Sequence, residues 1–308
     1  MAGDAGKRPA EELVGLRGKD QVLDFLAGAG FDVAQAARAQ LGSGDPVGAL
    51  LVGSVAEGYQ TASSDVDVLF LTYADRDELR RTSDLVIESG LSTETLTYAS
   101  GVEINTEIIC RDDYAALATQ LDQVAGSTAM GGQLRKLPML DKYSLRFLHR
   151  LRTGIVLFGP DVVDEFRADF HVRSLPLYLS VKYFVLARES LEDARSASVT
   201  TPGLIEFICR NILENCLLAL AAAHDFTSQS RRFVMNWLAE LSEDAPHRSQ
   251  LLDLRARLLD GAAVAPEHKQ ALVNEVTTAY DMVWTALRED PVRRKVLDQV
   301  FDRISYAY

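Results

Sequence analysis

Short apolar runs with alternating polar positions dominate the chain between residues 47 and 110. They are rich in branched apolar residues and are bounded by glycine, serine and aspartate, a pattern typical of β-strands. The pattern predicts strands at 47–52, 65–72, 93–100 and 102–110. Helical spacing of apolar residues predicts helices beside this sheet at 77–88, 112–124 and 143–153.

From residue 175 onward the apolar spacing is helical almost throughout, with short connections, which favours a helical bundle. We therefore expect an α+β chain, in which a mixed sheet flanked by helices precedes an α-helical bundle. The expected divisions are a tail with leading helices at 1–45, a catalytic domain at 46–165 and the bundle at 170–308.

Composition narrows the class of protein. Of 308 residues, 47% are hydrophobic and 25% charged, which is ordinary for a globular protein with a sizeable core. The net charge of −12 argues against a nucleic-acid binder, because such binding needs a basic face. No apolar run reaches the length of a membrane span, and the three cysteines show no metal-binding spacing. These features predict a cytoplasmic protein without a membrane partner.

Candidate chemistry gathers between Leu50 and Thr72. The first apolar run ends in Gly53-Ser54, where glycine permits a sharp turn and a helix start would leave unpaired N–H groups for an anion. The second run opens with Asp65 and Asp67, which share one face of a strand. Two partly desolvated acids side by side repel each other, and a divalent cation such as Mg²⁺ removes that cost.

A third acid is available on the strand expected at 102–110. Glu103, Asn105 and Glu107 share a face by the period of two. The two glutamates lie about 13 Å apart at ~3.3 Å per residue, so only one of them can join the aspartate pair.

Gly53-Ser54, ten intervening residues and Asp65-x-Asp67 between two strand-like runs resemble the signature of the DNA polymerase β-like nucleotidyltransferase superfamily. The likeness is closer to its small-molecule branch, which includes the aminoglycoside nucleotidyltransferases, whose catalytic domain is also followed by helices. It implies transfer of a nucleoside monophosphate from an NTP, ATP by default, to a hydroxyl of a small molecule, with two Mg²⁺ ions.

The resemblance also implies roles for individual residues. Asp65, Asp67 and Glu107 are expected to be catalytic and to hold the metal, with Glu107 preferred over Glu103 because Ile-Asn-x-Glu is similar to the family's strand. The residues assigned to nucleotide binding are Gly53, Ser54, Ser64 and Lys182.

Several alternatives stay open at this point. The alternative interpretation of Lys182 is a lysine at the protein surface without a role in nucleotide binding. His149, Arg150 and Arg152 fit a solvated basic helix face better than they fit phosphate contacts. The reaction has two competitors: nucleotidylation of a protein, or a degenerate member that only binds nucleotide. The acidic balance suits a cationic acceptor, in antibiotic modification or in biosynthesis, and the apolar bundle can supply a homodimer interface.

Overall fold

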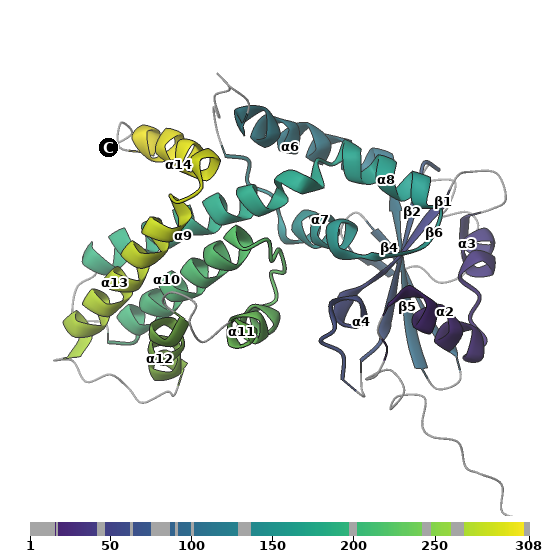
Figure 1. Cartoon of the computed structure of the whole chain (residues 1–308), viewed down its shortest axis with the longest axis horizontal. Helices are drawn as coiled ribbons and strands as arrows, with labels where there is room; N and C mark the ends of the chain where they lie inside the picture. Colours follow the sequence, from purple (N-terminus) through teal and green to yellow (C-terminus); the bar gives the residue numbers. More distant parts are fainter. Residues whose placement is uncertain are drawn as a thin grey trace, which may run out of the picture. The chain divides into compact units, whose positions relative to one another are not determined.

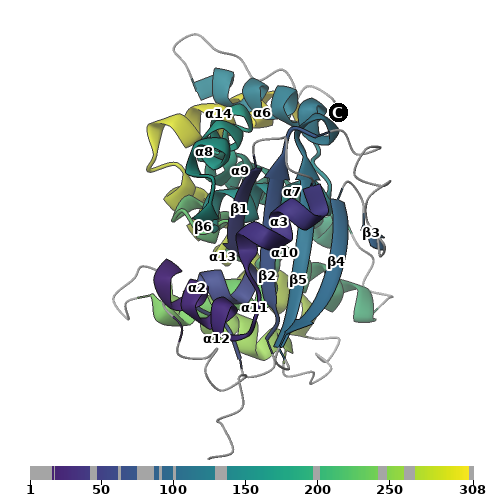
Figure 2. The same cartoon turned by 90° about the vertical axis from the view of Figure 1, so that its right-hand side faces the viewer.

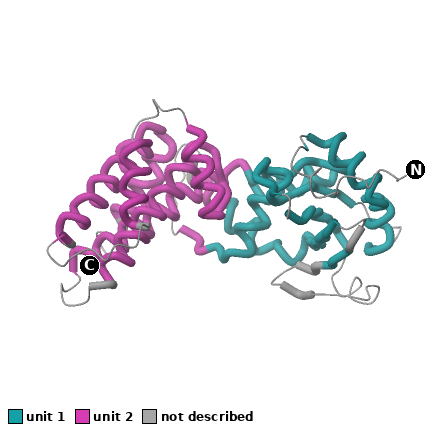
Figure 3. Tube along the Cα trace, turned by 90° about the horizontal axis from the view of Figure 1, so that it is seen from below, with its two compact units in different colours: residues 1–122, 140–172 teal, residues 123–139, 173–308 magenta. Residues whose placement is uncertain are grey.

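The chain forms two compact units, seen separately in Figure 3: residues 1–122 with 140–172, and residues 123–139 with 173–308. The computed structural model describes residues 16, 18–41, 47–61, 64–74, 87–89, 92–99, 102–128, 137–196, 202–241, 248–259 and 268–304 (Figure 1). The domain limits expected from the sequence stay a prediction.

A mixed sheet of six strands organises the first unit, in the order β3-β4-β5-β2-β1-β6. Its strands are β1 (Val47–Val52), β2 (Val66–Thr72), β3 (Ile87–Ser89), β4 (Ser92–Ala99), β5 (Val102–Cys110) and β6 (Ile155–Phe158). The central strands β2 and β5 run parallel, whereas the other neighbours pair antiparallel. The predicted strands are therefore present, each within one residue at either end.

Helices α2 (Lys19–Gly28) and α3 (Val33–Leu41) cover one face of the sheet, as Figure 2 shows. Their buried side chains join Val66, Val68 and Phe70 of β2 in one apolar cluster. Since side chains alternate along a strand, Asp67 points to the opposite face. That face is covered by α7 (Lys142–Thr153) and α8 (Pro160–Asp169), which contact β1.

Helix α7 is fixed at both ends. Asp141 caps its start, because its Oδ1 accepts hydrogen bonds of 2.8 Å from the backbone N–H groups of Tyr143 and Ser144. At the other end, a Cβ on Gly154 would lie 2.7 Å from the carbonyl oxygen of Arg150 and 3.1 Å from Cβ of Leu50. Only glycine lets the chain pass this close to β1, and α7 is thereby held against the face that carries Asp67.

The first unit also contains α4 (Gly53–Glu57) and the 3₁₀ turn η1 (Arg111–Tyr114), and α6 (Ala115–Thr128) crosses the division between the units. The second unit is helical. After the 3₁₀ turn η2 (Val172–Ser174), its helices are α9 (Leu175–Ser196), α10 (Pro202–Ala223), α11 (Arg231–Glu240), α12 (Arg248–Leu259), α13 (Lys269–Leu287) and α14 (Pro291–Ile304). Its core includes Phe184, which stacks on Tyr280 and Trp284 with ring centroids 4.5 and 5.3 Å away. The expected α+β class with a following helical region is confirmed.

Helix α8 was not predicted from the sequence, although Pro160 at its first turn is a helix start signal. The helix expected at 77–88 lies outside the described residues except for Ile87 and Glu88, which belong to β3. Across the described parts of the chain, no helix combines the length and apolarity needed to cross a membrane.

Candidate active site

Asp65, Asp67 and Glu107 line one pocket of the first unit, where the starts of β2 and its neighbour β5 lie side by side. The cavity has a volume of about 310 Å³ and a polar lining. Its other lining residues are Val68, Asn105, Thr106, Arg146 and Arg150. Residues 40 positions apart in the sequence thus meet through the pairing of β2 with β5.

Asp67 is the most perturbed acid of the pocket. Its side chain is only 18% exposed, and this burial raises its pKa from 3.8 to about 6. The guanidinium of Arg150, 3.5 Å away, lowers the pKa, whereas the negative charges of Asp65 and Glu107 raise it further. The protein therefore keeps a desolvated carboxylate that would gain from a nearby cation.

Gly53 is required by the position of Asp67. Strand pairing sets Val52 opposite Asp67, so Gly53 follows directly beside that carboxylate. A Cβ at position 53 would overlap Oδ2 of Asp67, and the backbone there has φ +73°, which side chains rarely adopt. The glycine after β1 thus leaves the space that the Asp67 carboxylate fills.

Ser54 and Ser64 lie near this pocket without lining it. Ser54 belongs to α4, which has only five residues, so its helix dipole offers little to an anion. The hydroxyl oxygen of Ser64 accepts a 2.8 Å hydrogen bond from the N–H of Thr61. Their assignment to nucleotide binding stays a prediction.

Asn105 holds Asp65 in place. Its amide Nδ2 donates a short hydrogen bond to Oδ2 of Asp65. In the parallel register Asn105 lies beside Asp67. Its amide nevertheless orients Asp65, which lies two residues before Asp67 in the sequence. The sequence pattern had placed Asn105 on the correct face, but we gave it no role.

Glu107 is held by two arginines of α7. Oε1 accepts from Arg146 at 3.1 Å, and Oε2 accepts from Arg150 at a shorter distance. The Glu107 residue is 8% exposed, whereas Glu103 does not line the pocket. The glutamate preferred from the sequence is thus the one beside the aspartates, although both of its oxygens are engaged.

The solvated basic face expected for α7 is wrong for two of its three residues. The side chains of Arg150 and His149 are only 15% and 10% exposed. Nε2 of His149 lies 3.2 Å from Oε1 of Glu57, which brings α7 and α4 into contact. Arg146, one helical turn before Arg150, is a pocket residue that our sequence analysis missed, and the spacing of four is the signal that could have found it.

The donor set fits a metal ion in part. Asp65 and Asp67 offer carboxylate oxygens, which Mg²⁺ prefers, and burial makes a cation favourable at Asp67. Within the described ranges, however, no group of three or more His, Cys, Asp or Glu side chains is arranged to hold a metal. Two aspartates completed by ligand oxygens fit an ion, whereas Glu107 fits as a third ligand only when its arginines turn elsewhere.

Lys182 belongs to α9 in the second unit, and the structure does not relate it to the pocket of the first. It is 8% exposed, so the alternative of a surface lysine is wrong. Its ammonium lies 5.9 Å from the ring centroids of Tyr178 and Tyr183, within reach of a cation–π contact.

Comparison with known proteins identifies no family. No family model matches the chain, and no curated protein does. A solved structure described as a nucleotidyltransferase-like protein from Exiguobacterium sibiricum 255-15 aligns over 89% of this chain and 90% of its own, with 11% identical residues and a TM-score of 0.44. A superposition this loose carries no weight for fold or activity.

Proposed function

We propose that this protein transfers a nucleoside monophosphate from an NTP to a hydroxyl of a small molecule and releases pyrophosphate. One observation carries the proposal: Asp65, Asp67 and Glu107 line a single pocket, with Asp67 desolvated against the turn at Gly53. Acids gathered in a polar cavity suit a metal-bound polyphosphate better than they suit a neutral ligand. The resemblance of the Gly53-Ser54 and Asp65-x-Asp67 motif to the nucleotidyltransferase signature points to the same reaction.

Asp65 and Asp67 are the residues that would hold Mg²⁺, which neutralises phosphate charge and orients the reacting groups when bound. Asn105 keeps Asp65 in position for that role. Gly53 leaves the space in which Asp67 can turn its carboxylate toward the pocket.

Arg146 and Arg150 are assigned to the triphosphate in this proposal. Guanidinium groups bind phosphate oxygens in pairs of hydrogen bonds, and both groups already line the pocket. Without a ligand they rest on Glu107 and Asp67. A polyanion offers them stronger partners, and their transfer would leave the oxygens of Glu107 available.

Glu107 then serves as the third carboxylate. As a general base it would accept the proton of the acceptor hydroxyl, while that oxygen forms a bond to the α-phosphorus. The bond between the α-phosphorus and the bridging oxygen breaks, and pyrophosphate leaves with that oxygen. Positioning and charge neutralisation supply most of the rate in such chemistry.

The test is incubation of the protein with Mg²⁺ and each of four NTPs against a panel of hydroxylated acceptors, cationic aminoglycosides included. Pyrophosphate release and a mass increase of one nucleotide on the acceptor are the expected results. The Asp65→Ala variant is the matched control and should lose both. Absence of turnover with every NTP, together with absence of Mg-NTP binding by calorimetry, would refute the proposal.

Two other outcomes identify the competing functions. Binding of Mg-NTP without turnover on any acceptor would indicate a degenerate member. A nucleotide found on a protein, rather than on a small molecule, would indicate protein nucleotidylation. ATP as the donor, a homodimer and a cytoplasmic location remain predictions.

A further inference from the structure

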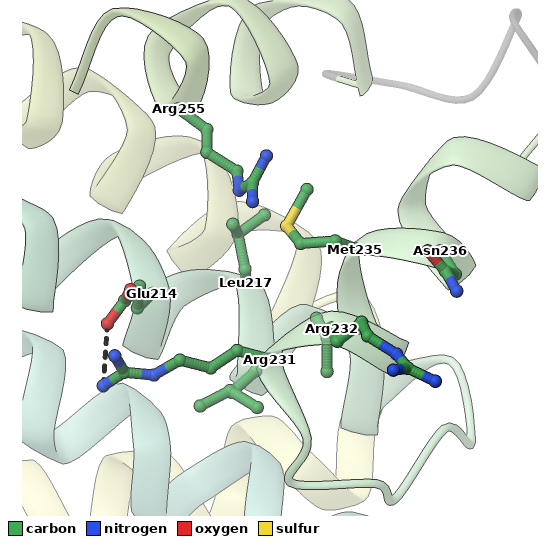
Figure 4. A pocket seen from close by; sticks show the side chains of 9 residues that line it. Glu214, Leu217, Arg231, Arg232, Met235, Asn236 and Arg255 are labelled. Atoms are coloured by element: carbon green, nitrogen blue, oxygen red, sulfur yellow. Dashed lines mark ion pairs between the residues drawn. The ribbon is translucent and has the colours of Figure 1, made fainter. Parts of the chain in front are cut away.

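The second unit contains a pocket that the proposed reaction does not use. It lies among α10, α11 and α12 and has a volume of about 480 Å³ (Figure 4). This volume is within the range of pockets that hold small organic ligands. The pocket is partly open to solvent, so a ligand can reach it from outside.

The walls of this pocket are apolar. They include Leu217 and Leu218 of α10 together with Val234 and Met235 of α11. Leu217 and Val234 are each only 2% exposed, so the helices fix these walls rigidly. An apolar body of a ligand would be desolvated against them, which favours binding in proportion to the apolar area removed from water.

The rim of the pocket is cationic. Arg231, Arg232 and Arg255 all line it, and Glu214 is the acid that lines it with them. The Glu214 carboxylate is already paired, since its Oε2 lies 2.9 Å from Nη2 of Arg231, as the dashed line in Figure 4 marks. A positive excess is left at this place, although the whole chain carries a net charge of −12. The rim is thus complementary to an anion.

Arg255 is the arginine best placed to hold an anionic head group. It comes from α12 and points toward Leu217 and Met235 in Figure 4, so its guanidinium lies above the apolar wall. No hydrogen bond or ion pair joins it to another residue in the described part of the chain. A guanidinium is weakly hydrated and forms paired hydrogen bonds with carboxylate or phosphate.

We propose that this pocket binds a small amphipathic anion, with an apolar body between α10 and α11 and a carboxylate or phosphate head group at Arg255. The proposal does not depend on nucleotide transfer, because it concerns residues of the second unit alone. It assigns a ligand class to a cavity that the nucleotide chemistry leaves unexplained.

Calorimetry with the full-length protein tests this proposal without nucleotide or metal. The probes are decanoate, octyl phosphate, decanol and inorganic phosphate. Saturable binding of one equivalent of decanoate or octyl phosphate is expected, at least tenfold tighter than decanol or inorganic phosphate. The ratio between decanoate and octyl phosphate distinguishes a carboxylate ligand from a phosphate ester.

Two arginines of α12 provide a matched pair of variants. Arg255→Gln should weaken decanoate at least tenfold and leave decanol within twofold. Arg257→Gln removes the same charge from the same helix, but Arg257 is exposed, does not line the pocket and pairs with Glu275, so decanoate binding should not change. Met235→Trp should fill the space and weaken decanoate and decanol together. Circular dichroism confirms that each variant is folded.

Three outcomes would overturn the proposal. The first is the absence of saturable decanoate and octyl phosphate binding to the wild-type protein. The second is equal affinity for decanoate and decanol, which would mean that the cationic rim has no role. The third is equal loss in Arg255→Gln and Arg257→Gln, which would indicate a general effect of charge.

Discussion

Replacing Asp67 with asparagine should stabilise the metal-free protein, and the gain should grow with pH. The carboxyl of Asp67 has a pKa of about 6 in the folded protein, raised by burial from 3.8. A group with a raised folded pKa contributes stability that is complete below the unfolded value. This contribution is lost as the pH rises through the folded value. The asparagine side chain carries no charge to desolvate and does not titrate.

The size of the effect follows from the shift. Each pKa unit corresponds to about 1.4 kcal/mol, so the full difference is about 3 kcal/mol above neutral pH. At pH 5, which lies between the two pKa values, the linkage relation gives roughly half of this difference, because the acid is ionised in the unfolded chain but still mostly protonated in the folded protein. Arg150 is not left without a partner in the variant, since it also donates to Glu107.

Urea unfolding of both proteins at pH 5 and pH 8, in the presence of a chelator, measures this difference. Circular dichroism is the suitable probe, because Trp237 and Trp284 both lie in the second unit and their fluorescence would report on that unit. An Asp24→Asn variant makes the same chemical change on the exposed face of α2 in the first unit, and it should show no comparable gain.

An Asp67→Asn variant that is no more stable than wild type at pH 8 would refute the reasoning. So would a gain of the same size at both pH values, which would show that the carboxyl does not titrate as its burial implies. Mg²⁺ should cancel most of this difference. An ion present at a hundred times its dissociation constant would stabilise the wild type by about 2.7 kcal/mol and leave the variant unchanged.

The other predictions concern activity and the turn after β1. Glu107→Gln should lower turnover at least 10²-fold, as loss of a general base does, whereas Glu103→Gln should stay within about twofold; the reverse order would move the third carboxylate to Glu103. Gly53→Ala and Gly58→Ala each place a side chain at positive φ. Each should lower the free energy of unfolding, measured by thermal unfolding, by about 1–2 kcal/mol. Gly58 has no neighbour within 4 Å of its added Cβ, so its variant should stay active. Gly53→Ala must displace the Asp67 carboxylate and should lose about 10²-fold in rate; equal activities would contradict this interpretation.

Local patterns were sufficient to predict the strands that build the pocket. The apolar runs of β1, β2 and β5 are each bounded on one side by glycine, serine or aspartate, and polar residues alternate with apolar ones at the start of β2 and β5. This alternation placed Asp65 with Asp67 and placed Glu107 on the face of Asn105. Parallel pairing of β2 with β5 then brings these residues together.

The arginines of the pocket could not be predicted in the same way. A row of basic residues on a helix looks alike in the sequence whether it faces water or a cavity. Arg146 and Arg150 meet Glu107 from 39 and 43 residues away, and that contact depends on how α7 packs against the sheet. Helix α8 was missed for a different reason, because the proline at its first turn, Pro160, was not used as a helix start signal.

Arg146 and Arg150 pair with carboxylates of the pocket, so positive charges of the protein itself balance these acids. Three acids in one cavity would destabilise the metal-free fold if only a bound cation offset their charge, as it does in small metal-dependent domains. Here two guanidiniums already offset most of that charge before any ligand arrives. Chelation should therefore abolish the proposed activity while leaving the protein folded, so purification without metal is expected to yield a folded protein that can bind metal again.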